Sequence, residues 1–336
     1  MQKSEFIDYA RGFSILTIVV YHLSQGLAMS LPFKYAFSFG GAGVHLFFFA
    51  SGFGLAKSKY TTYFDFLKRR LNKVLIPYYI TVTLIFLINI FIKIYPFGVP
   101  AYLSHIFLYK MFIPKYDESF GGQLWFISTI IQFYLVFPLI LWLLNKEKYK
   151  VFFGTALIIS LAYSLAVALS PYADLRVFNG FFLQYLWEFA LGMIVARTNT
   201  LDKIIGMPIW RYFLIALICI PVAMLMVLNG GAVGKSMNDL FVFAAYTSVV
   251  IILYRLAPVS KLILWITGFS YALYLTHLFI FSCFYTPETR AALGGFTLPV
   301  VFSGMILFAW AYNWLIIQVT SRKTVRSSIT HEDKTR

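Results

Sequence analysis

Apolar segments long enough to span a membrane recur along the whole 336-residue chain. A helix needs about 20 apolar residues to cross the roughly 30 Å hydrocarbon core of a bilayer, and in hydrocarbon its backbone must satisfy its own hydrogen bonds. Ten such segments are predicted, at residues 6–26, 41–56, 74–94, 123–144, 151–169, 181–196, 212–228, 239–254, 262–284 and 297–317. The sequence therefore predicts an all-α, polytopic bundle of about ten transmembrane helices.

The composition agrees with this fold class, because 60% of the residues are hydrophobic and only 12% are charged. Soluble domains carry roughly 25% charged residues. The apolar segments leave no room for a separate extramembrane domain. We expect residues 1–320 to form one membrane-embedded domain and residues 321–336 a short polar cytoplasmic tail without regular structure.

The net charge of +15 is unevenly distributed between the two sides of the predicted bundle. With the segments joined alternately, 21 of the 28 Lys and Arg residues fall on the side that holds both termini, and 7 fall on the other side. Basic residues accumulate on the cytoplasmic side of membrane proteins. Both termini are therefore predicted to be cytoplasmic. The excess of basic residues is therefore explained by the orientation of the protein in the membrane and does not indicate nucleic-acid binding.

Three ionisable residues, Asp8, Arg11 and His22, fall on one face of the first predicted helix. Arg11 and His22 are separated by about 20° more than three full turns and by about 16 Å along the axis. Ionisable groups inside a membrane are costly and usually face a cavity or a partner. Asp8 and Arg11 suit the cytoplasmic mouth of a cavity and His22 a position at mid-depth or beyond. A simple interfacial ion pair is the alternative for Asp8 and Arg11.

A second basic group, Lys68, Arg69, Arg70 and Lys73, lies in the loop predicted before Pro77. The positive-inside bias accounts for part of it. A dense basic run also suits phosphate, to which arginine offers two parallel hydrogen bonds. Since this group shares the cytoplasmic face with Arg11, we expect it to bind the phosphates of a soluble donor.

Further polar residues within the predicted helices are candidates for substrate binding. They are Trp125, Ser128, Gln132, Glu188, His277 and His45. Hydrogen bonding between helices is the alternative role for Ser128 and Gln132, and a paired structural role is the alternative for Glu188. His22, His45 and His277 are all expected in the outer half of the bilayer.

Six motifs stand in an order that resembles the acyltransferase 3 family of integral membrane acyltransferases. The first is the sequence of residues 6–12 followed by Tyr21 and His22. The others lie at residues 43–53, 69–78, 124–138, 188–193 and 270–277. The resemblance runs from about residue 6 to residue 317.

This resemblance implies transfer of an acyl group, commonly acetyl from acetyl-CoA, to a hydroxyl of a cell-surface glycan or lipid-linked saccharide. It implies a multi-pass protein of the bacterial cytoplasmic membrane, and an enzyme that transfers groups other than amino-acyl groups. Arg11 and His22 match the family's arginine and histidine with ten residues between them. Arg70 and Lys73 match its Arg-x-x-Arg pair, but a lysine at the second position lacks the planar fork of arginine. His45 stands where many members have an acidic residue.

The predicted catalytic residues are thus His22, Arg11 and Asp8, with Lys68, Arg69, Arg70 and Lys73 binding acyl-CoA. His22 acts either as a general base or as an acyl carrier, and the sequence leaves both open. We expect no metal and no permanently bound cofactor, because acyl-CoA is a co-substrate. The expected partners are the acceptor and membrane lipids, without nucleic acid. A secondary transporter or flippase, with the polar residues as a substrate pathway, is the alternative function.

Overall fold

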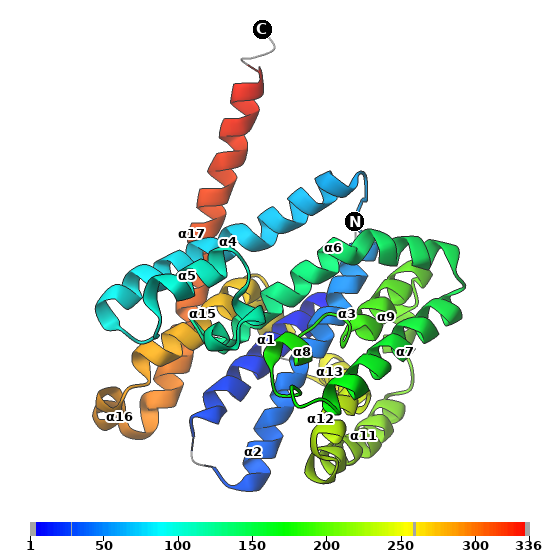
Figure 1. Ribbon diagram of the computed structural model, residues 1–336. Coiled ribbons are helices and arrows are strands. Elements are labelled where there is room, and N and C mark those ends of the chain that lie inside the picture. The colour runs from blue at the N-terminus through cyan, green and yellow to red at the C-terminus, as the bar shows by residue number, and fades with distance from the viewer. Residues whose placement is uncertain (1–4, 28, 258–259, 333–336) are drawn as a thin grey trace.

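The computed structural model describes residues 5–27, 29–257 and 260–332, which form helices and turns without a strand (Figure 1). The helices are α1 Glu5–Gln25, α2 Leu31–Ser38, α3 Gly43–Ala56, α4 Tyr63–Ile92, α5 Gly98–Ile106, α6 Trp125–Lys146, α7 Tyr149–Ala168, α8 Arg176–Asn179, α9 Leu186–Thr198, α10 Leu201–Ile205, α11 Ile209–Asn229, α12 Gly231–Met237, α13 Asp239–Leu256, α14 Ser260–Thr267, α15 Ser270–Phe284, α16 Pro287–Leu293 and α17 Thr297–Glu332. The all-α prediction is confirmed for the described residues.

Seven helical segments of the described chain are long and apolar enough to cross a membrane. They are Leu31–Ala56, Tyr63–Ile92, Gly122–Lys146, Tyr149–Ala168, Ile209–Asn229, Asp239–Leu256 and Pro287–Gln318. The pair α14 and α15, which is bent by 80°, raises the number to eight if it forms one span. The chain is therefore a multi-pass membrane protein. The predicted total of ten also counted α1, which carries three charged residues, and α9, which has only 13 residues. That total and the side of the termini stay predictions.

Large apolar side chains cover the outer helices of the bundle. Phe91 on α4 is 84% exposed, and Ile158 on α7 and Leu217 on α11 are exposed as well. Contiguous apolar surface of this kind is unfavourable in water and marks contact with lipid or protein. This surface is consistent with a bundle that is embedded in a bilayer.

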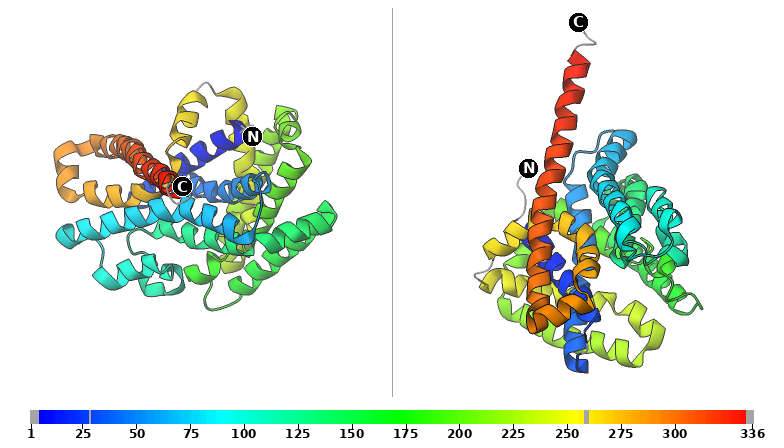
Figure 2. Two further views of the ribbon diagram at one scale, coloured as in Figure 1. Left: turned by 90° about the horizontal axis from the view of Figure 1, so that it is seen from above. Right: turned by 90° about the vertical axis from the view of Figure 1, so that its left-hand side faces the viewer.

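Helices α1 and α3 occupy the middle of the bundle (Figure 2). Helices α15 and α17 lie toward one end of the bundle in the view from above, and α7 and α11 lie toward the other. α1 buries residues on most of its circumference, including Tyr9, Ile15 and Val19. The polar face of α1 is therefore enclosed by other helices.

Glycines allow α3 and α9 to pack closely. A Cβ atom at Gly52 of α3 would lie 2.0 Å from the carbonyl oxygen of Phe189, and one at Gly192 of α9 would lie 2.0 Å from that of Phe49. Any larger side chain would collide with the facing backbone at both positions. Small residues of this kind bring helix backbones together in membranes, where lipid provides no hydrophobic drive for association.

The basic group around Arg70 is helical, not part of a loop as predicted. α4 begins at Tyr63 because the Thr62 hydroxyl accepts a hydrogen bond from the Asp65 amide at 3.2 Å, which caps the helix. Pro77 does not interrupt α4. The four basic residues therefore project from one regular helix, and only one face of it can point into the bundle.

The segment from residue 93 to residue 124 is ordered by buried contacts. It contains α5 and short 3-10 turns. His105 is buried, with its Nδ1 2.8 Å from the Tyr78 hydroxyl and its Nε2 3.0 Å from the Ser119 hydroxyl. The Lys110 ammonium is 1% exposed and donates to the backbone carbonyls of Asp117 and Gly121. These buried contacts fix the start of α6.

The C-terminal tail also differs from expectation. α17 continues to Glu332, whereas the sequence predicted no regular structure in residues 321–336. Residues 333–336 lie outside the described residues.

Candidate active site

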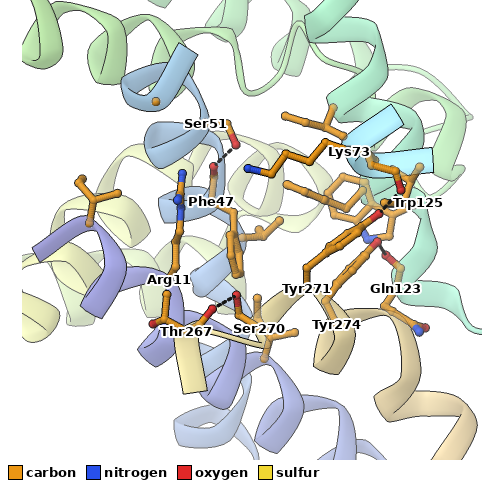
Figure 3. Close-up of a pocket in the computed structure, with 18 of the residues that line it drawn as sticks. Arg11, Phe47, Ser51, Lys73, Gln123, Trp125, Thr267, Ser270, Tyr271 and Tyr274 are labelled. Carbon is orange, nitrogen blue, oxygen red and sulfur yellow. Dashed lines mark hydrogen bonds between the residues drawn. The ribbon is translucent and has the colours of Figure 1, made fainter. Parts of the chain in front are cut away.

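A cavity of about 1050 Å³ lies between α1, α3, α4, α6 and α15 (Figure 3). Ligand pockets of proteins are typically about 300–1,000 Å³. The lining includes Asp8, Arg11 and His22 of α1, so the predicted polar face of that helix does face a cavity. Arg70 and Lys73 of α4 line it as well. One continuous cavity thus connects the basic residues with His22.

The end of the cavity near the start of α1 is cationic. Arg11 is held by a 3.2 Å hydrogen bond from Nη2 to the carbonyl of Ala50, and its Nη1 lies 3.9 Å from Oδ1 of Asp8. Figure 3 shows Arg11 and Lys73 extending into this part of the cavity from opposite walls. Lys57, Arg70 and Lys73 add to the lining, with Asp8 as the carboxylate among these residues. This cationic end favours a polyanionic ligand.

Deeper in the bundle, His22 meets His277 of α15. The Nδ1 atom of His22 lies 2.8 Å from Nε2 of His277, and the planes of the two rings are nearly parallel, at an angle of 3°. His277 is fully buried, and its Nδ1 lies 3.0 Å from the carbonyl oxygens of both Leu273 and Tyr274. His22 lines the cavity and His277 supports it from behind. An imidazole is a suitable general base near neutral pH.

The wall near His22 is aromatic and polar. Tyr274 donates a 2.7 Å hydrogen bond to the carbonyl of Gln123, and Tyr271 donates one of 2.8 Å to the carbonyl of Val74. Trp125, Tyr271, Tyr274 and Gln123 lie on one side of the view in Figure 3. The Gln123 side chain is 3% exposed, and neither atom of its amide has a hydrogen-bond partner among the described residues. A buried amide without partners is costly and is suited to binding a polar ligand.

Two charged residues, Arg176 of α8 and Glu118 of the segment before α6, complete this wall. The Arg176 guanidinium lies 5.1 Å from the Trp125 ring centre, and its Nη1 donates to the Asn179 side chain at 3.3 Å. Glu118 lines the cavity as well. Nε of Arg176 lies 4.0 Å from Oδ2 of Asp117, and Glu118 adds a negative charge to the lining, so this end is close to neutral while the other end is cationic.

Several lining residues were missed by the sequence interpretation: Lys57, Glu118, Arg176, Tyr271 and Tyr274. Tyr271 and Tyr274 precede His277 by six and three residues, and this helical spacing could have placed them on a shared face. Glu118 lies in a turn and Arg176 begins the four-residue helix α8, and both segments are too short for periodicity to give guidance.

Other predicted residues lie outside the cavity lining. Arg69 donates to the carbonyl of Lys59 at 3.2 Å, and Lys68 does not line the cavity. Gln132 accepts a 3.2 Å hydrogen bond from the backbone amide of Phe182. Ser128 is buried and does not line the cavity. Among the predicted substrate-binding residues, Trp125 lines the cavity. His277 does not line it but forms a hydrogen bond with His22, which does.

His45 and Glu188 form a separate buried cluster with Asp239. Nδ1 of His45 lies 2.7 Å from Oε1 of Glu188, and its Nε2 lies 3.9 Å from Oδ1 of Asp239. One nitrogen or oxygen atom from each residue lies within 4.8 Å of the others, a spacing that suits a metal ion. All three residues stand in the first turn of their helices. At this position the helix dipole stabilises the carboxylates of Glu188 and Asp239. The cluster thus links the starts of α3, α9 and α13, away from the cavity.

The fold defines an integral membrane protein that contains a cavity within its helical bundle. The sequence model of the acyltransferase 3 family, described as an acyltransferase domain, matches residues 4–316. The chain belongs to this family and is a membrane acyltransferase. No curated protein and no solved structure matches the chain.

Proposed function

We propose that this protein transfers an acetyl or another short acyl group from cytoplasmic acyl-CoA to a hydroxyl of a cell-surface glycan or lipid-linked saccharide. The setting is the cytoplasmic membrane of a bacterium. The observation that supports the proposal best is the single cavity that contains both Arg11 and His22, together with Arg70 and Lys73. A polyanion bound at the cationic end can extend an uncharged arm toward His22.

On the donor side, the phosphates of CoA bind near Arg11, Arg70 and Lys73. Arginine offers two parallel hydrogen bonds to a phosphate, whereas Lys73 contributes a point charge. The pantetheine arm then follows the α1 face toward His22, over about 16 Å along the helix axis. Phe47 and Phe126 line the cavity and provide an apolar surface for that arm.

The chemistry is placed at His22. As a general base, its imidazole takes the proton of the acceptor hydroxyl while the oxygen attacks the thioester carbonyl. The carbon–sulfur bond breaks, and the CoA thiolate leaves and receives that proton. As a nucleophile, the same imidazole first takes the acyl group and then passes it to the acceptor. Both routes need His22 in contact with the cavity.

The acceptor reaches His22 at the nearly neutral end of the cavity. The ring of Trp125 offers an apolar face for a sugar, and the amide of Gln123 can both donate to and accept from hydroxyl groups. Arg176 and Glu118 add further polar contacts. The difference in charge between the cationic end and the nearly neutral end supports a polyanionic donor and a hydroxylic acceptor.

The test is acyl transfer from radiolabelled acetyl-CoA in membranes that contain the full-length protein. His22→Ala is expected to reduce the transfer by about 10²-fold or more, the usual contribution of a general base. Undiminished transfer in that variant would remove His22 from the mechanism. A transporter or flippase would move its substrate without any dependence on acyl-CoA, so the same membranes distinguish that alternative. Deletion of the gene is expected to remove an O-acetyl signal from the surface glycans, as seen by mass and NMR analysis.

A further inference from the structure

The hydrogen-bond partners of His277 define which of its nitrogens carries hydrogen. Its Nδ1 faces the carbonyl oxygens of Leu273 and Tyr274, at 3.0 Å each. A carbonyl oxygen only accepts hydrogen bonds, so Nδ1 must be the protonated nitrogen. In the neutral ring, Nε2 is then an acceptor.

The same reasoning continues to His22. Its Nδ1 lies 2.8 Å from Nε2 of His277, a normal hydrogen-bond length. Because Nε2 of His277 has no hydrogen to give, Nδ1 of His22 must donate. The Nε2 of neutral His22 therefore carries a lone pair, and it forms no hydrogen bond with the described residues.

The ring geometry agrees with this assignment. The N–H bond and the lone pair of an imidazole both lie in the ring plane, so a hydrogen bond between two imidazoles is best when the rings are coplanar. The planes of His22 and His277 differ by 3°, with ring centres 5.1 Å apart. Because the ring centres are 5.1 Å apart while the two nitrogens approach to 2.8 Å, the rings meet edge to edge and do not stack face to face.

We propose that His277 is a positioning residue that fixes the tautomer of His22 and keeps the Nε2 lone pair of His22 available in the cavity. The inference rests on the proposed function, since it concerns the same reaction. In serine hydrolases a buried aspartate performs the corresponding task for the catalytic histidine. A neutral imidazole anchored on backbone carbonyls does so without placing another charge inside the membrane, where charges are expensive.

The arrangement also limits where a proton can move. When Nε2 of His22 takes the proton of the acceptor, the Nδ1 proton of His22 can shift to Nε2 of His277. The hydrogen-bond chain ends there, because the carbonyls of Leu273 and Tyr274 do not take up a proton. The positive charge stays within the pair until the leaving thiolate takes a proton back from Nε2 of His22.

Three substitutions of His277 separate positioning from packing. His277→Leu fills the space without accepting a hydrogen bond, whereas His277→Gln and His277→Asn offer a carbonyl oxygen to the Nδ1 hydrogen of His22. We expect His277→Leu to lower kcat tenfold or more with the KM for acetyl-CoA unchanged. At least one amide variant should recover most of that loss. Equal losses in all three folded variants, or a loss confined to KM, would contradict the proposal.

Nitrogen-15 NMR tests the tautomer independently of activity. The full-length protein is labelled with ¹⁵N-histidine, and the His22 resonances are assigned by their loss in His22→Gln. We expect hydrogen on Nδ1 of His22 in wild type and a different tautomer distribution in His277→Leu. Hydrogen on Nε2 of His22 in the wild type would overturn the inference even if acyl transfer is found. Absence of acyl transfer with the expected tautomer would instead count against the proposed function alone.

Discussion

His45 and Glu188 are joined by a 2.7 Å hydrogen bond in the interior of the bundle, which connects the start of α3 to the start of α9. We expect Glu188→Ala to destabilise the protein by about 3–5 kcal/mol, because removing one partner leaves the others of a buried charged cluster uncompensated. Glu188→Gln keeps an acceptor for His45 and should cost less. The measurement is thermal unfolding in detergent, with Glu147→Gln on the exposed surface as the control.

The same variants also test the role of the cluster of His45, Glu188 and Asp239. If it joins helices and does not bind substrate, the Glu188→Gln variant that remains folded should keep the wild-type KM for acetyl-CoA. A stable variant with a strongly raised KM for either substrate would contradict this assignment. Chelation with EDTA is expected to leave the melting temperature unchanged, and a fall would indicate a metal bound by His45, Glu188 and Asp239.

Arg70 and Arg69 are adjacent in sequence but differ in their position relative to the cavity. Arg70 lines the cavity, whereas Arg69 donates to the carbonyl of Lys59. A hydrogen bond to a charged group contributes about 1.5–3 kcal/mol. Arg70→Ala should therefore raise the KM for acetyl-CoA roughly 10- to 100-fold, and Arg69→Ala should change it much less. Steady-state kinetics in membranes measure both values, and equal effects would mean that the phosphates bind outside the cavity.

Replacing Gln123 by an apolar residue is expected to raise the stability of the protein and to lower its activity. Gln123→Leu removes a buried amide that has no partner, so the free energy of unfolding should rise by about 1 kcal/mol. Acceptor use should fall, because the hydroxyl groups of the acceptor lose their partner. The expected signature is a raised melting temperature, reduced acyl transfer and an unchanged KM for acetyl-CoA. A lower melting temperature would show that Gln123 serves the fold rather than the acceptor.

Lys110 makes folding stability depend on pH. Burial lowers the pKa of this lysine to about 8, although Asp117 and Glu118 act in the opposite direction. Between that value and the roughly 10.4 of an unfolded chain, the unfolded state binds more protons than the folded state. The free energy of unfolding should therefore rise with pH above about 8, by at most about 1.4 kcal/mol per pH unit.

The variant Lys110→Met should remove this contribution to the slope. Thermal unfolding in detergent at pH 8, 9 and 10 measures it as the difference between wild type and variant. Lys115→Met, a change at an exposed lysine nearby, should keep the wild-type slope. A slope that survives in Lys110→Met would have to come from another group.

The sequence predicted the relationships within single helices and missed those between helices. Asp8, Arg11 and His22 could be placed on one face because helical periodicity relates positions in the same element. The contact between His22 and His277 joins residues 255 positions apart, and no spacing rule gives the packing of α1 against α15. The contact of His45 with Glu188 was missed for the same reason.

Element boundaries failed where local chemistry decided them. The start of α4 was predicted at residue 74, where the apolar run begins, although the helix starts at Tyr63 after the Thr62 cap. A cap is set by one side chain and is independent of hydrophobicity. The span predicted at 181–196 contains turns before α9 begins at Leu186. Hydropathy therefore did not locate the start of either helix.

The last prediction concerns the close packing of α3 and α9. Gly52→Ala places a Cβ atom 2.0 Å from the carbonyl oxygen of Phe189, which belongs to a helix backbone and cannot move aside cheaply. We expect this variant to lose most of its folded, detergent-soluble yield. Gly154→Ala in α7 is the matched control, because nothing lies within 4 Å of its added Cβ atom. That change should stabilise the protein by about 0.5–1 kcal/mol, since alanine favours a helix over glycine. Size-exclusion profiles and melting temperatures of the two variants measure both effects, and a Gly52→Ala protein with wild-type yield and stability would mean that α3 and α9 are not in contact at this position.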